Sequence, residues 1–397
     1  MWRKINTDGA KIDAILSRGV EDVVVSDHLR QALLSGRRLR VKLGIDPTSK
    51  TIHIGRAITL WKLREFQDLG HTVVLIIGDF TAQVGDASDK LEKRPMLSEA
   101  EVKENLKNYK ASAGKILNMR KVEFFYNSRW LAKLKFKETC QLAETFSVQQ
   151  MISRRNFAER LEKGQEVSLR EFLYPLMQGY DSVMVKADVE LGGTDQLFNL
   201  KAGRIVQKHY GQTEQDILMT SMLEGTDGRK MSSSWGNVIG ITDVPGDMYG
   251  KVMAVRDELV IKYFTLCTRL SVFEIDALRQ KLTAGANPKE IKMRLAREIV
   301  ALYHGGEAAI RAEKEFQETF SAGGIPENIP TVKADPAKLL ADILVEQKIL
   351  PSKAQWRRLV DEGAVFNMET KEKTSDPFVK AVAGVYRLGK KTFIRLN

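Results

Sequence analysis

The amino-acid sequence predicts an α/β protein with a doubly wound parallel sheet, followed by an α-helical domain and a small α+β domain. The first observation is a strand, a helix and a strand expected in succession over residues 40–78, which is one right-handed crossover unit. The second is the continuously apolar run at 72–78, which is typical of a strand buried on both faces of a parallel sheet. The third is the stretch at 323–330, whose two glycines and two prolines indicate a domain boundary.

The first elements are expected in the following order. Residues 1 to about 36 should be helical, because their apolar side chains are spaced for one helix face. Residues 40–45 should form a strand. Residues 53–70 should form an amphipathic helix that ends at Gly70, since glycine commonly closes helices.

The later segments are more varied. A helix-rich insertion over about 97–170 interrupts the alternation, and a strand is expected at 184–188. From about 240 to 323 the pattern is helical and amphipathic, and the last 60 residues should contain a helix at 352–363 and a hairpin about 389–391. These patterns divide the chain into a sheet domain with the insertion, a helical domain, a linker and a C-terminal domain, at 1–222, 223–323, 324–337 and 338–397.

The chain of 397 residues carries a net charge of +11, which indicates either a polyanionic partner or a surface that only aids solubility. Residues 338–397 hold 12 Lys and Arg against 7 Asp and Glu, a net of 12 − 7 = +5, so nucleic acid is the leading candidate. Cys140 and Cys267 lie far apart, which excludes a cysteine-rich zinc site and a disulfide framework. We expect a cytoplasmic protein without a membrane span, because no apolar run reaches roughly 20 residues and the N-terminus lacks the apolar core of a secretory signal.

Two separated motifs have the features that polyphosphate chemistry needs. The first, Gly44–Arg56, places a glycine, a turn and the His53-Ile-Gly55 element at the start of a helix, whose N-terminus favours anions. The second begins at Gly228 and carries Lys230 on a glycine-flanked loop, where a flexible cation can close on phosphates. Alone, the first could be an ordinary helix cap and the second an ordinary turn; together they favour nucleotide chemistry.

A third pattern is polar. Tyr174, Gln178 and Asp181 are spaced to lie on one face of a helix. A phenol, an amide and a carboxylate buried together are costly unless they hold a polar ligand. The alternative is a solvated helix face, but the apolar residues around these three disfavour exposure.

The two nucleotide motifs resemble the HIGH and KMSKS signatures of class I aminoacyl-tRNA synthetases. From about residue 40 to the C-terminus, the chain resembles the bacterial tyrosyl-tRNA synthetases: Tyr174, Gln178 and Asp181 match the tyrosine pocket of that family, and Gly192–Gln196 matches its ribose loop. The C-terminal domain resembles their ribosomal-protein-type RNA-binding domain. The resemblance implies a Rossmann-like catalytic domain and a tyrosine–tRNA ligase activity, in which L-tyrosine is activated to tyrosyl-adenylate and transferred to the 3'-terminal adenosine of tRNA-Tyr. It further implies ATP with Mg²⁺ as substrate, no tightly bound protein metal, and a homodimer formed through the insertion.

The resemblance also implies roles for individual residues. Those expected to stabilise the polyphosphate are Thr48, His53, Lys90, Arg94 and Lys230. Further residues expected around ATP are Gly44, Asp46, Gly55, Arg56, Thr59, Gly193, Asp195, Ser232 and Ser233. Residues expected to hold tyrosine are Asp86, Tyr174, Gln178, Asp181 and Gln196. Those expected to contact tRNA are Lys353, Arg357, Arg358, Lys390 and Lys391.

The chain departs from the family pattern at several positions. Arg56 replaces the second histidine of HIGH, Ser233 replaces the second lysine of KMSKS, and Ala87 and Asp89 replace a proline and a glycine. These changes leave open a catalytically altered paralogue that acts as an RNA-binding protein. A tryptophan-activating relative is a second alternative, which Asp181 disfavours because an indole has no hydroxyl to pair with that carboxylate. A nucleotide-binding oxidoreductase and a P-loop NTPase are disfavoured because their glycine motifs do not occur in the sequence.

Overall fold

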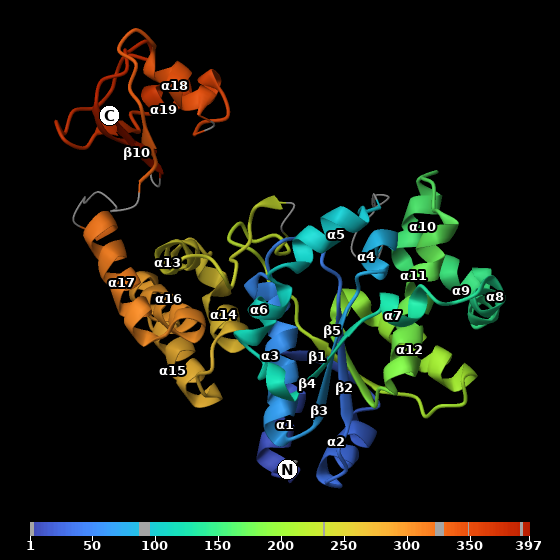
Figure 1. The fold of residues 1–397 in the computed structure, drawn as a ribbon. Coiled ribbons are helices and arrows are strands. Elements are labelled where there is room, and N and C mark those ends of the chain that lie inside the picture. The colour runs from blue at the N-terminus through green and yellow to red at the C-terminus, as the bar shows by residue number, and fades with distance from the viewer. Residues whose placement is uncertain (1–3, 87–95, 233–234, 322–328, 348, 390–391) are drawn as a thin grey trace. The chain divides into compact units, whose positions relative to one another are not determined.

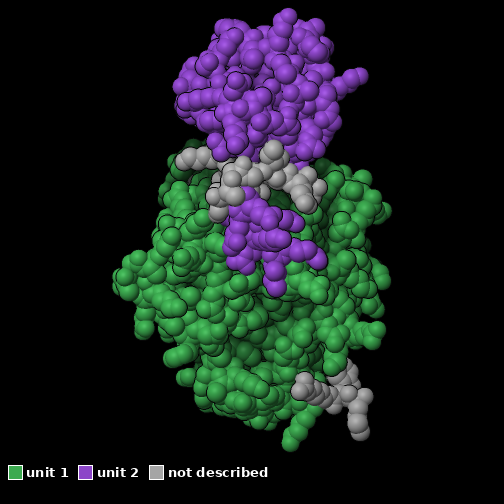
Figure 2. Space-filling view, turned by 90° about the vertical axis from the view of Figure 1, so that its left-hand side faces the viewer, with its two compact units in different colours: residues 1–309 green, residues 310–397 purple. Residues whose placement is uncertain are grey.

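The computed structural model describes residues 4–86, 96–232, 235–321, 329–347, 349–389 and 392–397 (Figure 1). The chain forms two compact units, unit 1 at residues 1–309 and unit 2 at residues 310–397 (Figure 2). The domain boundaries drawn from the sequence stay predictions. Within the described residues, no helix has both the length and the apolar character that a membrane crossing requires.

Unit 1 contains a six-stranded mixed sheet. Its strands in spatial order are β1 (Val20–Val24), β6 (Asp216–Thr220), β5 (Val189–Gly193), β2 (Arg40–Ile45), β3 (Thr72–Ile77) and β4 (Val122–Tyr126). All neighbouring strands are parallel except β1, which pairs antiparallel with β6. The prediction of a wholly parallel sheet is therefore wrong at one edge, where an antiparallel strand is common on doubly wound sheets.

The crossovers place helices on both faces of this sheet. Helix α3 (Ile54–Leu69) connects β2 to β3, and α12 (Leu197–His209) connects β5 to β6. The two connections run outward in opposite directions from the central pair β2 and β5, so right-handed crossovers put α3 and α12 on opposite faces (Figure 1). The strand order thus reverses between β2 and β5, and doubly wound sheets bind their ligands at the carboxyl ends of such strands.

The crossover unit predicted from residues 40–78 is confirmed. Strand β2 covers the predicted range, and every residue of β3 is buried, as its continuous apolar sequence predicts. Helix α3 begins after His53, whose side chain caps it, and ends at Gly70 with a φ of 97°. That left-handed conformation favours glycine, which explains why the helix stops there.

Three elements differ from the prediction. The strand expected at 184–188 is wrong, because α11 (Leu169–Val185) extends into the start of this range and is followed by its C-cap Lys186, with a φ of 50°. The strand follows at β5. Strand β1 interrupts the expected N-terminal helices with a short valine-rich segment, and β4 lies within the insertion, where its five residues gave a signal too brief to separate from the helices around it.

The remaining helices of unit 1 surround the sheet and extend beyond it. In chain order they are α1 (Gly9–Ser17), α2 (Ser26–Leu34), α4 (Thr81–Val84), α5 (Glu99–Leu106), α6 (Tyr109–Gly114), α7 (Ser128–Leu131), α8 (Phe136–Ala143), α9 (Val148–Ile152), α10 (Arg155–Glu162), α13 (Pro245–Met253), α14 (Val260–Cys267), α15 (Val272–Thr283) and α16 (Pro288–His304). Helix α16 packs on both α13 and α14, in agreement with the helical pattern predicted after residue 240. Helix α17 (Gly306–Ser321) follows.

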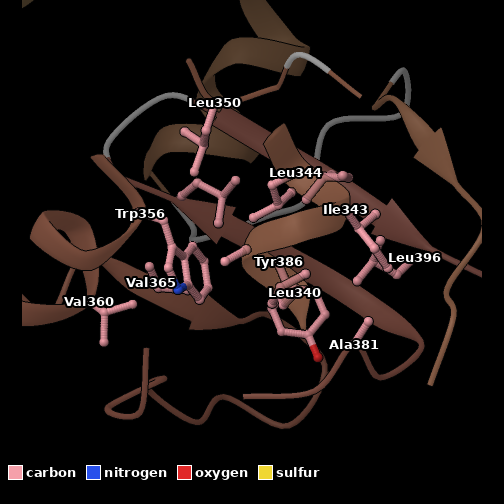
Figure 3. Close-up of a cluster of buried hydrophobic side chains, with 13 residues drawn as sticks. Leu340, Ile343, Leu344, Leu350, Trp356, Val360, Val365, Ala381, Tyr386 and Leu396 are labelled. Carbon is pink, nitrogen blue, oxygen red and sulfur yellow. The ribbon is translucent and has the colours of Figure 1, made fainter. Parts of the chain in front are cut away.

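Unit 2 has a core of its own. Four strands pair in the order β7 (Thr331–Val332), β10 (Thr392–Leu396), β9 (Gly384–Leu388) and β8 (Val365–Asn367), beside α18 (Leu340–Glu346) and α19 (Lys353–Asp361). The predicted hairpin is confirmed as the antiparallel pair of β9 and β10. Trp356 belongs to the apolar cluster (Figure 3), and its indole N–H donates to the Pro377 carbonyl oxygen at 2.8 Å. This satisfied polar group lets a tryptophan fill the core of a small domain.

Candidate active site

A cavity of about 740 Å³ opens at the carboxyl ends of the central strands. Its wall includes Gly44 at the end of β2, Gly78 after β3, Gly193 at the end of β5 and Thr220 at the end of β6. This is the reversal point of the strand order, so the position of the cavity follows from the topology. Its size is that of a pocket for a small organic ligand or nucleotide.

The structure brings the predicted site residues of unit 1 together. All sixteen that it describes line this cavity: Gly44, Asp46, Thr48, His53, Gly55, Arg56, Thr59, Asp86, Tyr174, Gln178, Asp181, Gly193, Asp195, Gln196, Lys230 and Ser232. Three others, Lys90, Arg94 and Ser233, lie outside the described residues. The two motifs and the polar helix face, which are distant in sequence, therefore share one wall.

His53 is held as a neutral imidazole. Its Nδ1 accepts a hydrogen bond from the backbone N–H of Arg56 at 3.3 Å. Burial lowers its pKa to about 3, with further lowering by the charges of Arg56 and Lys230. Because Nδ1 is the acceptor, the ring proton is on Nε2. At Gly55 a Cβ atom would lie 3.1 Å from this ring, so glycine keeps the helix start close to His53.

Arg56 is anchored by two hydroxyl groups. Its Nη2 donates to Thr48 Oγ1 at 2.8 Å, and its Nη1 donates to the Tyr109 hydroxyl at 3.1 Å. The guanidinium therefore joins the turn after β2 to α6. This planar fork uses several donors at once, which a histidine at this position could not do.

An ion pair and hydrogen bonds hold the loop that carries Lys230. Lys230 Nζ lies 3.0 Å from Asp195 Oδ2, at the start of the segment that follows β5. Asn237 donates to Asp227 at 2.8 Å and accepts from the backbone N–H of Ser232 at 2.8 Å. The loop thus places Lys230 at the cavity. Asn237 connects the segment before Lys230 to the segment after it.

Asp46, in the first motif, contacts the polar face of α11. Its carboxylate accepts from the Thr81 hydroxyl at 2.7 Å and from the Tyr174 hydroxyl at 2.8 Å. Burial raises the pKa of Asp46 to about 6, although both hydrogen bonds lower it. A Cβ at Gly78 would lie 1.9 Å from Asp46 Oδ1, so only glycine lets β3 end this close to the carboxylate.

Asp181 is buried, and a protein donor contacts each of its two carboxylate oxygens. Its two oxygens accept from Trp130 Nε1 at 2.7 Å and from Asn127 Nδ2 at 3.2 Å, and the residue is 4% exposed. Burial raises its pKa to about 7, against the lowering effect of the Lys42 charge and of these two donors. Asn127 also donates to Thr81 at 3.0 Å, so one hydrogen-bond network connects Asp181 to Asp46.

Asp86 is a third buried carboxylate. It accepts from Gln196 Nε2 at 2.8 Å and from Asn199 Nδ2 at 3.3 Å, and Arg154 Nη2 lies 3.4 Å from it. Arg154 itself lies between the rings of Phe157 and Phe198. The carboxylate therefore faces the cavity with its orientation fixed by groups from α12 and from the start of α10.

Several of these partners were not predicted from the sequence. They are Thr81, Asn127, Trp130, Arg154 and Asn199. Asn127 and Trp130 follow β4 directly, so recognition of that strand would have placed them at the carboxyl edge of the sheet. Arg154 lies between two short helices and carries no sequence signal of this kind.

The predicted tRNA-binding residues belong to unit 2. Lys353, Arg357 and Arg358 are exposed on α19, and Lys390 and Lys391 lie outside the described residues. Lys353 pairs with Asp342 at 2.6 Å, while the Arg357 guanidinium lies over the Phe378 ring. Within the described part of the chain, no three His, Cys, Asp or Glu side chains gather in a way that could hold a metal ion.

Comparison with known proteins identifies a family. Residues 34–321 match the family model described as tRNA synthetases class I (W and Y). The chain is 44% identical to the tyrosine–tRNA ligase of Moorella thermoacetica, over 100% of this chain and 98% of that protein. It is also 44% identical to the tyrosine–tRNA ligase of Thermotoga maritima, over 96% of each.

Solved structures agree on the fold. A C-terminally truncated mitochondrial tyrosyl-tRNA synthetase from Coccidioides posadasii superposes with a TM-score of 0.63 at 23% identity, covering 77% of this chain and 91% of its own. The tyrosyl-tRNA synthetase of Archaeoglobus fulgidus, complexed with L-tyrosine, gives a TM-score of 0.61 at 20% identity and covers 77% of this chain and 100% of its own. At these identities the likeness shows a shared fold.

Proposed function

The chain belongs to the bacterial tyrosyl-tRNA synthetases of class I, and we propose that it activates L-tyrosine with ATP and transfers it to tRNA-Tyr. The observation that carries this proposal is the buried carboxylate of Asp181 in the cavity wall. Trp130 and Asn127 satisfy part of its acceptor capacity, and a phenolic hydroxyl from the cavity can donate to the rest. Phenylalanine supplies no such donor, so its entry leaves a desolvated carboxylate incompletely paired.

The α-ammonium group of tyrosine meets acceptors at the same end of the cavity. The Tyr174 hydroxyl donates its proton to Asp46, so its oxygen lone pairs can face an ammonium donor. Asp86 supplies a negative charge, and Gln178 and Gln196 supply amide groups on the cavity wall. Together with Asp181 these groups fix the two ends of the amino acid, which places its carboxylate toward ATP.

The polyphosphate lies, in this proposal, against the two motifs. Neutral His53 offers its Nε2 proton to a phosphate oxygen, and the α3 N-terminus behind it favours negative charge. Lys230, Thr48 and Arg56 supply further donors from the cavity wall. We assign Lys90 and Arg94 to the same group of cations from the family pattern. Mg²⁺ enters bound to the phosphates of ATP, which is how this ion commonly reaches such sites.

The reaction then needs positioning and charge stabilisation more than a covalent nucleophile. A carboxylate oxygen of tyrosine attacks the α-phosphorus of ATP, the bond to the bridging oxygen breaks, and pyrophosphate leaves with the electron pair. A ribose hydroxyl of the terminal adenosine of tRNA next attacks the activated carbonyl carbon, its proton is lost, and AMP departs. Donors aimed at the pyrophosphate stabilise charge that develops in the first transition state.

Unit 2 binds tRNA in this proposal through phosphate contacts, so its affinity should fall with salt. Support comes from the exposed basic residues of α19 and from an apolar core that belongs to this unit alone. Deletion of residues 333–397 should spare tyrosyl-adenylate formation and impair tRNA charging. Equal losses in both assays would show instead that the C-terminal part only stabilises the fold.

We further propose that the chain forms a homodimer through the insertion. Large apolar side chains are exposed on this part of unit 1: Phe136 is 85% exposed on α8, Leu169 is 80% exposed at the start of α11, and Val148 is 59% exposed on α9. Exposed apolar groups gathered in one region favour association. Sedimentation of the wild type beside Phe136→Glu would test this, with a monomeric variant as the expected result.

The experiment that tests the proposed activity is ATP–pyrophosphate exchange with tyrosine, phenylalanine and tryptophan in parallel, without tRNA. Exchange with tyrosine alone is expected. Exchange with tryptophan would favour the tryptophan-activating alternative. No exchange with any of the three would favour the RNA-binding paralogue that Arg56 and Ser233 leave open.

A further inference from the structure

A buried ion pair lies directly behind the wall that faces the amino acid. Lys42 on β2 and Glu190 on β5 are register partners on neighbouring parallel strands. Their side chains are 0% and 1% exposed, and Lys42 Nζ lies 2.9 Å from Glu190 Oε1. Neither residue lines the cavity, and no motif in the sequence pointed to this pair.

The pair is bonded to α11, which carries the polar face of the site. Lys42 Nζ donates to the backbone carbonyl oxygen of Gln178 at 2.9 Å and to Ser182 Oγ at 2.7 Å. Glu190 accepts from the Gln178 side chain at 3.0 Å, from Ser182 Oγ at 3.1 Å and from Gln215 Nε2. The Glu190 carboxylate is the acceptor in each of these hydrogen bonds.

The fold leaves room for this network at one point on α12. A Cβ at Gly203 would lie 2.3 Å from Gln215 Nε2 and 3.0 Å from Glu190 Oε2. Glycine at this position lets α12 pack against the sheet while the carboxylate keeps its partners. Such a buried pair is weak evidence for stability, because apolar residues of similar size often replace one at no cost.

This network affects the site through the side-chain amide of Gln178. A carboxylate can only accept, so the amide nitrogen must face Glu190 and the amide oxygen must point the other way. Gln178 lines the cavity, and its oxygen has no partner among the described residues. An amide free to rotate would offer the cavity either a donor or an acceptor.

We propose that Glu190, held by Lys42, fixes the Gln178 amide with its oxygen toward the cavity, and that this makes the wall select ligands with an ammonium group. The proposal rests on the assignment of tyrosine as substrate. Glu190 and Lys42 are positioning residues, since they act through Gln178 and do not touch the ligand. The fixed orientation saves the reorganisation that a rotating amide would need when the ammonium binds.

The test replaces the pair by two methionines of similar length, Lys42→Met with Glu190→Met, in the full-length protein. Two ligands are compared as competitive inhibitors of tyrosine-dependent ATP–pyrophosphate exchange: tyramine, which has a phenol and an ammonium group, and 4-ethylphenol, which has only the phenol. The ratio of their inhibition constants measures ammonium preference. We expect this ratio to fall about tenfold or more in the variant, because a hydrogen bond to a charged group is lost or must be reoriented. Inhibition by 4-ethylphenol should stay nearly unchanged.

The matched control is Arg160→Met with Glu171→Met. This is also a buried ion pair against α11, with Arg160 Nη1 2.7 Å from Glu171 Oε1 and both side chains 1% exposed, but it does not contact Gln178. Its loss should leave the ratio as in the wild type. In the variant of the Lys42 pair, the KM for tyrosine should also rise while kcat changes much less, since the ammonium contact is made in both ground and transition states.

An unchanged ratio in the folded variant, or an equal loss for both phenols, would overturn the inference. If the double methionine variant does not fold, Lys42→Leu with Glu190→Leu removes the same charges and also removes the acceptor for the Gln178 amide. A ratio unchanged in that variant would overturn the inference equally. If the wild-type protein shows no tyrosine-dependent exchange, the proposed function fails and this inference fails with it. If the wild type is active and the ratio is unchanged in the variant, only this inference fails.

Discussion

The two ends of the cavity are built in different ways. At the amino-acid end, the Asp46 and Asp181 carboxylates each accept two hydrogen bonds from protein side chains. At the phosphate end, Arg56 lies on a helix start and Lys230 on a loop, and the Lys230 side chain is 34% exposed. One end is a buried acceptor site, and the other is a more open donor site.

This difference predicts which end of the cavity already has its final geometry before its ligand binds. The buried carboxylates already accept hydrogen bonds from protein side chains, so we expect their geometry to be fixed before an amino acid binds. Lys230 is paired with Asp195, and a polyphosphate would have to replace that partner as it binds. We therefore expect substitutions at the phosphate end to change the rate, and substitutions at the amino-acid end to change the selectivity.

The largest effect is expected at Lys230. Lys230→Ala removes a cation that stabilises charge developing on pyrophosphate, so kcat for tyrosine activation should fall by about 10²- to 10³-fold. The KM for tyrosine should change little, because the lysine is at the other end. Pre-steady-state measurement of adenylate formation checks both values.

A matched control for that variant is Lys292→Ala. Lys292 is also ion-paired, with its Nζ 2.8 Å from Asp257, but it does not line the cavity. Its removal should leave adenylate formation as in the wild type. A variant at position 230 with normal kcat and a raised KM for tyrosine would contradict the division of the cavity into two ends.

The second effect concerns selectivity. Asp181→Ala removes the acceptor for the phenol and leaves the Trp130 and Asn127 donors without it. The preference for tyrosine over phenylalanine, measured as the ratio of kcat/KM in exchange, should fall by about 10²-fold. Asp216→Ala is the control, since Asp216 is also a buried aspartate but pairs with His28 outside the cavity. An unchanged preference in Asp181→Ala would remove this residue from its assigned role.

The same two ends show how far the sequence could lead. The two motifs and the polar face of α11 could be recognised in the sequence because each is local: a turn, a loop and one helix face, and their described site residues line one cavity. Strands β2 and β3 were predictable for the same reason: in β2 apolar residues alternate with other residues, and β3 is almost continuously apolar.

The partners that fix the buried end could not be predicted in this way. Asn127 and Trp130 reach Asp181 only because β4 pairs with β3, and Glu190 meets Lys42 only through the register of β5 against β2. A pairing across strands depends on the whole topology. A single residue such as Arg154, between two short helices, gives no periodic signal that a sequence pattern could detect.

The third prediction uses the titration of Asp181. Burial raises its pKa from about 3.8 to about 7, so between these values the native state binds a proton that the unfolded state does not. Stability from this group is therefore present below pH 4 and is lost as the pH rises to 7. Asp181→Asn keeps the shape without the titration. Relative to this variant, the wild type should lose up to about 1.4 kcal/mol of unfolding free energy per pH unit in that window.

Urea unfolding of both proteins at pH 5 and pH 7 measures this difference. His53 has a pKa lowered to about 3, so its own contribution has the opposite sign and is lost as the pH falls below about 6.5. Because His53 and Asp46 are present in both proteins, their contributions cancel in the comparison. Stability curves that run parallel between pH 5 and pH 7 would show that Asp181 does not titrate in this range.

The smallest effect is expected at Arg56, which replaces a histidine of the family signature. Its guanidinium contacts Thr48 and Tyr109 at the same time, and a lysine could reach only one of them. Arg56→Lys should raise the KM for ATP by about threefold to tenfold, the cost of about one hydrogen bond. The KM for tyrosine should not change. Tyr109→Phe removes one of the two contacts and leaves the charge, so it should raise the KM for ATP by less than Arg56→Lys does. If both variants instead raised the KM for tyrosine, the two ends of the cavity would be coupled through this arginine, and the separation between a fixed acceptor site and a more open donor site would no longer hold.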